Sequence, residues 1–308
     1  MGHVYCSRMT TLILGTPIEF GPIEMWPLSH RNPMEQAALG DVAQLFVDEA
    51  PEPDPGSLWV ENGGDAPVFL PIGSVFGGLQ QSRMLVEDVY VGPGEGFEIR
   101  VACVEAGRFS DRQASRTAGR APLSVVVAGM PGAGRPQDRW RRQSQVWEAV
   151  SRQEGRSGTR PTHSLEQVMQ EDLMGPTTQR RLAERIDEGF DPSKDQVGAV
   201  LAVAGKPLLL EVFRSPSLAR ELLADLLVGV AFDVDLTGAL PATQDCIKHF
   251  IREACRTPLD ATGSGDETYR VCGTTDAMSV HGTWLNPSEC LHLLAINVRH
   301  PLLQGAAV

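Results

Sequence analysis

The stretch from Pro67 to Arg108 constrains the fold of this chain more than any other. Its apolar residues alternate or run together, and each run stops at a glycine, a proline or a cluster of charges. This pattern predicts three consecutive β-strands. Further strands are expected before it, at 11–14, 23–28, 42–49 and 57–61. Strands that follow one another this closely form antiparallel sheet, because parallel pairing needs longer crossovers.

The second half of the chain mixes predicted helices with predicted strands. Periodicity and capping signals, including a capping box at Ser164 to Gln167, predict helices at 137–152, 164–173, 178–188, 217–231 and 243–255. Alternating apolar residues predict strands at 197–204, 208–213, 267–272, 277–284 and 290–298. In the last helix, Ile247, Phe250, Ile251 and Ala254 form one apolar stripe. The sequence therefore predicts an α+β fold, with antiparallel, sandwich-like β-sheets and several packed helices, as a single domain over 1–308.

The charge of the chain is unevenly distributed. The 308 residues carry a net charge of −12 with a pI near 5.1, which argues against a general nucleic-acid binder. Between Ala106 and Arg160, however, there are eleven arginines, no lysine and four acidic residues. Arginine binds phosphate and carboxylate groups bidentately, so this window either contacts such a ligand or is a solvated surface. We expect an arginine-rich surface excursion at 109–195.

The cysteines and the N-terminus indicate the compartment. Six cysteines are scattered without a C-x-x-C pair, which favours free thiols in a reducing environment. The apolar run near the start is too short and too poorly flanked for a signal peptide or a membrane span. We therefore expect a cytoplasmic protein without membrane contact, and the sequence leaves open whether it forms a homo-oligomer.

One segment imitates a phosphate-binding loop. The apolar residues 123–128 predict a strand, and the turn from Gly129 to Arg135 has the spacing of such a loop. Arginine stands at the lysine position, and Pro136 stands where a serine or threonine would bind magnesium. The segment therefore argues against nucleotide hydrolysis of this type. The preceding residues 109–122 predict a polar loop.

A few polar residues interrupt the predicted strands and define a candidate site. Gly77-Gly78 precedes the run from Gln80 to Arg83, and two glycines let the backbone approach another group closely. Arg83, Glu105 and Arg108 stand near the ends of neighbouring strands, where guanidinium groups bind an anion and a carboxylate acts as acid or base. A cross-strand ion pair between Arg83 and Glu105 would explain the same residues without a ligand.

The helix predicted at 137–152 adds two candidates. Trp147 is either a core residue or an aromatic platform for a base, and Gln143 lies one turn earlier on the same side. His292 is expected to be buried and hydrogen bonded. The sequence has no H-E-x-x-H or His-x-His spacing, so we expect neither a metal site nor a cofactor.

These candidate residues resemble the motifs of a known family. The similar segments are Gly78-Leu79-Gln80-Gln81-Ser82-Arg83, Cys103-Val104-Glu105-Ala106-Gly107-Arg108-Phe109 and Gln143-Ser144-Gln145-Val146-Trp147. They resemble the domain named for its association with ADP-ribosylglycohydrolases and rhodanese-phosphatases, the first of two families so named. The resemblance covers most of the chain. It departs from the family at Gln80, Ser82 and Phe109, where the family has lysine, asparagine and tryptophan.

The resemblance implies a function in the metabolism of NAD and ADP-ribose derivatives. The chain would be a small-molecule binding protein or a hydrolase-like enzyme, with an anionic nucleotide-like compound as ligand. The alternative is a non-catalytic ligand sensor or interaction module that serves NAD and ADP-ribose enzymes, and a scaffold is a third reading. The sequence does not decide whether the protein is an enzyme. The roles implied are acid or base for Glu105, anion clamps for Arg83 and Arg108, hydrogen-bonding partners for Gln81 and Gln143, and a stacking surface for Trp147.

Overall fold

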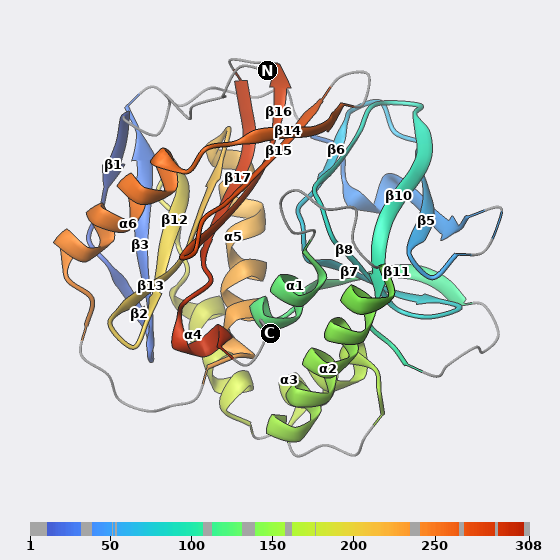
Figure 1. The fold of residues 1–308 in the computed structure, drawn as a ribbon, viewed down its shortest axis with the longest axis horizontal. Helices are drawn as coiled ribbons and strands as arrows, with labels where there is room; N and C mark the ends of the chain where they lie inside the picture. The colour runs from blue at the N-terminus through green and yellow to red at the C-terminus, as the bar shows by residue number, and fades with distance from the viewer. Residues whose placement is uncertain are drawn as a thin grey trace. The chain divides into compact units, whose positions relative to one another are not determined.

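The computed structural model describes residues 11–31, 39–50, 52, 54–106, 113–130, 139–157, 162–175, 177–234, 241–264, 268–286 and 289–304 (Figure 1). The chain divides into two compact units. The first unit comprises Met1–Gln36 and Arg181–Gly305, and the second comprises Ala37–Arg180 with the last three residues. Antiparallel sheets packed with helices form both units, so the predicted α+β class is confirmed. The single domain over 1–308 stays a prediction.

The first unit is built on a nine-stranded antiparallel sheet. Its strands are β1 (Leu12–Leu14), β2 (Ile18–Phe20), β3 (Ile23–His30), β12 (Gln196–Val203), β13 (Lys206–Phe213), β14 (Asp260–Ser264), β15 (Tyr269–Thr274), β16 (Met278–Asn286) and β17 (Glu289–Asn297). The order is β1-β3-β12-β13-β17-β16-β15-β14, and β2 pairs with β3. All eight residues of β12 are buried, because this central strand is covered on both faces.

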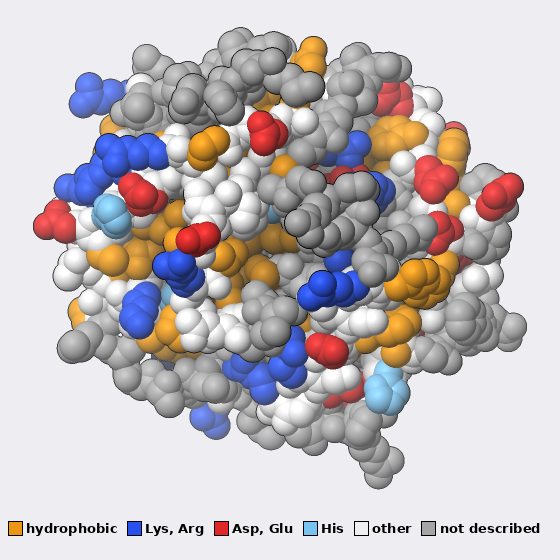
Figure 2. Space-filling model, viewed as in Figure 1, with side chains coloured by type: hydrophobic (Ala, Val, Ile, Leu, Met, Phe, Trp, Pro, Cys, Tyr) orange, Lys and Arg blue, Asp and Glu red, His pale blue; other side chains and the backbone are white. Residues whose placement is uncertain are grey.

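Helices α4 (Thr178–Gly189), α5 (Pro216–Ala231) and α6 (Gln244–Arg256) and the short 3-10 helix η3 (Pro301–Leu303) complete this unit, with α4 beginning at its boundary. The predicted stripe of α6 is confirmed, since Ile247, Phe250 and Ala254 are buried in the core that the sheet forms with this helix. Charged side chains cover the outer face of α6 (Figure 2). Helix α5 packs on β12 and β13.

The second unit contains a six-stranded sheet of order β11-β7-β8-β10-β5-β4 and a two-stranded sheet of β6 and β9. The bounds are β4 (Leu45–Glu49), β5 (Ser57–Asn62), β6 (Val68–Leu70), β7 (Ser74–Leu79), β8 (Arg83–Leu85), β9 (Val89–Val91), β10 (Gly96–Cys103) and β11 (Gln113–Arg120), with a 3-10 helix η2 at Val42–Gln44. The stretch from Pro67 to Arg108 therefore contains five strands, not three, because turns divide its apolar runs. Residues 42–44 are the start of a 3-10 helix and not of a strand.

Two further predictions in the second unit are wrong. Part of the predicted polar loop is strand β11, which pairs with β7 through two register shifts. The apolar run expected to be a strand is helix α1 (Leu123–Gly129). The valines of this run favour strands intrinsically, but packing against the next helix outweighs that preference. A phosphate-binding loop follows a strand, so this helix also removes the structural context for one.

Helix α2 (Arg139–Ser157) packs on α1, on β10 and on helix α3 (Leu165–Met174). The start of α3 agrees with the sequence, but its N-cap residue Ser164 makes no side-chain capping hydrogen bond. Residues 109–195 thus contribute β11 and α1 to α4. Within them Arg120 is buried and donates a hydrogen bond to the carbonyl of Ile72. The surface excursion expected for this range stays a prediction.

Asp172, in the last turns of α3, is expected to make stability depend on pH. Burial, with help from Glu171, raises the pKa of its carboxyl from 3.8 to about 6, and Arg156 opposes the shift. The folded state therefore binds this proton more tightly than the unfolded chain, and the free energy of unfolding falls as pH rises between these two values. Asp172→Asn should stabilise the protein by about 2 kcal/mol at neutral pH and by less in acid. Urea unfolding of the wild type and of Asp172→Asn across this pH range checks the prediction. If the free energy of unfolding of the two proteins changed with pH in the same way, the prediction would be contradicted.

Candidate functional site

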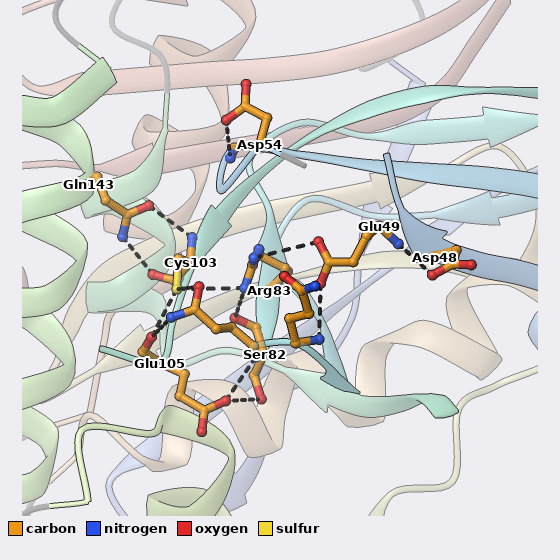
Figure 3. Close-up of polar contacts among 11 residues, drawn as sticks. Asp48, Glu49, Asp54, Ser82, Arg83, Cys103, Glu105 and Gln143 are labelled. Atoms are coloured by element: carbon orange, nitrogen blue, oxygen red, sulfur yellow. Dashed lines mark hydrogen bonds and ion pairs between the residues drawn. The ribbon is translucent and has the colours of Figure 1, made fainter. Parts of the chain in front are cut away.

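Four of the six predicted site residues lie together in the second unit. Arg83 of β8 pairs across the ladder with Cys103 at the end of β10, Gln81 precedes β8, and Glu105 follows β10. Gln143 reaches the same place from α2 (Figure 3). Each of these predicted residues is less than a tenth exposed. Arg108 lies outside the described residues.

The guanidinium of Arg83 is buried against protein groups. Its Nη2 lies 3.8 Å from Oε2 of Glu49 in β4. Its Nη1 lies 3.5 Å from the carbonyl oxygen of Ser82 and 3.7 Å from Sγ of Cys103. Figure 3 shows Arg83 between Glu49 and Cys103. The ion pair that the structure gives Arg83 is thus with Glu49, where the sequence suggested Glu105.

The carboxylate of Glu105 is held by Ser82. Its Oε2 accepts hydrogen bonds from the backbone N–H of Ser82 at 2.9 Å and from Oγ of the same residue at 3.2 Å. Oγ of Ser82 also lies 3.0 Å from Oε2 of Glu166. Because a hydroxyl carries only one hydrogen, Oγ of Ser82 donates to one of these two buried carboxylates at a time or shares its hydrogen between them. Sequence reasoning missed Glu166, which it read only as part of a helix start.

The two glycines of β7 permit these close contacts. A side chain at Gly77 would collide with the carboxylate of Glu166, and one at Gly78 would collide with the carbonyl oxygen of Ala114. Nε of Arg116 donates to Oε1 of Glu166 at 2.8 Å, so this carboxylate has a cationic partner. The predicted close approach to the glycines is confirmed, and the approaching groups belong to the protein itself.

Gln143 joins α2 to β10. Its Oε1 accepts from the backbone N–H of Cys103 at 2.9 Å, and its Nε2 donates to the carbonyl of Cys103 at 2.7 Å. Burial raises the pKa of the Cys103 thiol, and nearby Arg83 and the indole of Trp147 oppose that change. Trp147, which is partly buried, is therefore a fifth predicted residue beside Cys103. The thiol is therefore protonated near neutral pH and is a poor nucleophile.

A cavity of about 180 Å³ opens beside β10 in the second unit. Gln143 lines it, so one predicted residue faces this space. The other lining residues come from the turn before β5, from β5, from the residue after β8, from β10, and from helices α1 and α2. They are Asp54, Gly56, Ser57, Val86, Glu98, Arg100, Val101, Ala102, Gly129 and Arg142.

The polar groups of this cavity suit a charged ligand. Ser57 is 4% exposed, and its Oγ has no hydrogen-bond partner within the described part of the chain. Arg100 and Arg142 bring positive charge, while Asp54 and Glu98 bring negative charge. Such a set can bind an anion through the guanidinium groups and hydroxyl groups through the carboxylates. Sequence reasoning missed these residues, although Arg142 directly precedes Gln143 and Glu98 and Arg100 alternate along β10.

In the first unit, His292 is buried and hydrogen bonded, as predicted. Its Nε2 lies 2.9 Å from Oε1 of Glu211, and both side chains are fully buried. The ring of Phe213 stacks on the imidazole with 4.9 Å between the ring centres. Because both side chains are fully buried, this pair is a feature of the core.

Over the described ranges, no group of three or more His, Cys, Asp or Glu residues is arranged to hold a metal ion. Within the same ranges, no helix has both the length and the apolar character needed to cross a bilayer.

Comparison with known proteins identifies the family. No protein with a curated description and no solved structure matches the chain. A family model described as the ARG and Rhodanese-Phosphatase-superfamily-associated Protein domain matches residues 11–296. This name links the domain to ADP-ribosylglycohydrolase-associated proteins. Because the match spans most of its length, the chain belongs to the family of the ARG and rhodanese-phosphatase-superfamily-associated protein domain.

Proposed function

We propose that this protein binds an anionic, nucleotide-like small molecule of the NAD or ADP-ribose class in the cavity beside β10. The observation that carries the proposal is the buried hydroxyl of Ser57, which lacks a hydrogen-bond partner among the described residues and lines a cavity that also contains Arg100 and Arg142. A buried polar group without a partner costs about 1–3 kcal/mol. A ligand that accepts this hydrogen bond would recover that energy. The family name supports the class of ligand.

The residues predicted from the sequence take supporting roles in this proposal. Gln143 contacts the ligand, since it lines the cavity. Arg83, Gln81 and Glu105 hold the ends of β8 and β10 in place and act as positioning residues, because their polar groups bond to neighbouring protein atoms. Arg108 keeps its proposed role as an anion clamp.

Binding without turnover is the second candidate. The burial of Glu105, at 4% exposure, favours it, because a general acid or base must reach the ligand. Incubation with NAD and ADP-ribose followed by chromatography separates the two candidates. If a glycosidic or phosphoester bond is cleaved, Glu105→Gln then decides whether this carboxylate takes part. Full turnover by that variant would remove Glu105 from the mechanism.

The test of binding is a thermal shift measurement with ADP-ribose, NAD and AMP. A ligand that binds only the folded state stabilises it by RT ln(1 + L/Kd), where L is the ligand concentration, so Tm rises as the ligand concentration exceeds Kd. Arg142→Gln should weaken binding about 10- to 100-fold, because a hydrogen bond between two charged groups contributes about 1.5–3 kcal/mol. The matched control is Arg141→Gln, which removes the same charge from an exposed neighbour on α2 that does not line the cavity.

Two results would contradict the proposal. The first is the absence of any shift with all three compounds at millimolar concentration. The second is equal binding by Arg142→Gln and Arg141→Gln, which would place the ligand elsewhere on the protein.

A further inference from the structure

We propose that the cavity beside β10 recognises the phosphorylated sugar of its ligand and leaves the base outside. This inference rests on the binding role proposed above and narrows it to one part of the ligand. Three properties of the cavity carry it: its size, the absence of aromatic side chains from its described lining residues, and the presence of both signs of charge.

The size of the cavity limits what can enter. Its volume of about 180 Å³ is below the roughly 300–1,000 Å³ of pockets that enclose a drug-sized molecule. A complete dinucleotide exceeds this space. A pentose with one phosphate is less than half of such a ligand and fits the smaller volume.

The described lining residues offer no aromatic ring for a base to stack on. Among the described residues that line the cavity, the apolar ones are Val86, Val101 and Ala102, and none is aromatic. Proteins that hold a base usually stack it on an aromatic ring, which contributes about 1–3 kcal/mol per base. Trp147, the aromatic candidate from the sequence, is not among the lining residues. Adenine or nicotinamide therefore has no aromatic partner among these described residues.

The lining carries cations that suit a phosphate and carboxylates that suit hydroxyls. Nη1 of Arg100 lies 3.3 Å from Glu87, but a guanidinium carries five N–H groups, and this side chain is 54% exposed. Arg100 and Arg142 can thus share a phosphate. The carboxylates of Asp54 and Glu98 accept hydrogen bonds and repel phosphate, so they suit sugar hydroxyls. The Ser57 hydroxyl and the amide of Gln143 complete a polar lining that a sugar phosphate satisfies.

The experiment is calorimetry on the full chain with ribose 5-phosphate, ADP-ribose, adenosine and inorganic phosphate. The Kd of ribose 5-phosphate should lie within about tenfold of the Kd of ADP-ribose, and adenosine should not bind. Asp54→Asn should weaken the binding of ribose 5-phosphate about three- to tenfold, as expected for one hydrogen bond, without weakening the binding of inorganic phosphate. This variant keeps an oxygen to accept the hydrogen bond of 3.0 Å from the backbone N–H of Gly56. Glu61→Gln, on an exposed position of β5 away from the cavity, is the matched control.

Each other outcome overturns a defined part of this account. If ADP-ribose and adenosine bind while ribose 5-phosphate does not, the base is recognised, and the proposed function stands without this inference. If ribose 5-phosphate binds no more tightly than inorganic phosphate and Asp54→Asn has no effect, the cavity is a simple anion site. If ADP-ribose does not bind, and NAD and AMP give no thermal shift either, the proposed function falls together with the inference.

Discussion

Glu211→Ala is expected to destabilise the protein by about 3–5 kcal/mol, because it removes one partner of a buried hydrogen-bonded pair. Oε1 of Glu211 lies 2.9 Å from Nε2 of His292, and neither side chain is exposed. Alanine leaves the imidazole without this hydrogen bond and also opens a cavity between β13 and β17, which pair along these residues. Urea unfolding monitored by tryptophan fluorescence measures the change.

Two variants separate the hydrogen bond from the packing. Glu211→Gln keeps an oxygen at hydrogen-bonding distance and should cost about 1 kcal/mol. The double variant Glu211→Leu with His292→Phe replaces both polar groups by apolar ones, and such replacements are often close to neutral. This explanation would be wrong if Glu211→Ala lowered the free energy of unfolding less than Glu211→Gln did. It would also be wrong if the double variant lowered it as much as the alanine variant.

Gly78→Ala is expected to destabilise the protein by about 2–4 kcal/mol, from backbone strain and a steric clash together. Gly78 has a φ of 82°, a backbone conformation that residues with a Cβ rarely adopt. A Cβ at this position would also meet the carbonyl oxygen of Ala114 in β11, which is backbone and cannot turn aside. The pairing of β7 with β11 would have to open.

Gly94→Ala is the matched control for this variant. Gly94 has a similar φ of 69°, but no heavy atom lies within 4 Å of the position of its added Cβ. Gly94→Ala should therefore lower the free energy of unfolding only by the cost of backbone strain, about 1–2 kcal/mol. Chemical unfolding of both variants gives the difference. Equal losses would show that Ala114 can move, and the close packing of β7 on β11 would then not contribute to stability.

Patterns local to the chain predicted much of the fold. The α+β class, the hairpin of β12 and β13, and the apolar stripe of α6 all follow from spacing that neighbouring residues impose. The exceptions are places where distant contacts decide. Val125 to Val127 form a helix because they pack on α2, and residues 113–120 form a strand because β7 offers a free edge.

The sequence placed several site residues together but did not determine their partners. Arg83 and Glu105 do stand at neighbouring strand ends, yet Arg83 meets Glu49 and Glu105 meets Ser82. Partner choice depends on which face each side chain takes and on strand order, and neither is encoded in local spacing. The cavity was missed for the same reason. Asp54, Arg100 and Arg142 are far apart in sequence and meet only through tertiary structure.

The most direct test of the central claim is a crystal structure of the protein soaked with ADP-ribose. The account predicts a phosphate between the guanidinium groups of Arg100 and Arg142, with the Ser57 hydroxyl bonded to the ligand and the adenine outside the cavity. ADP-ribose bound at any other place, with the cavity beside β10 holding only solvent, would contradict it.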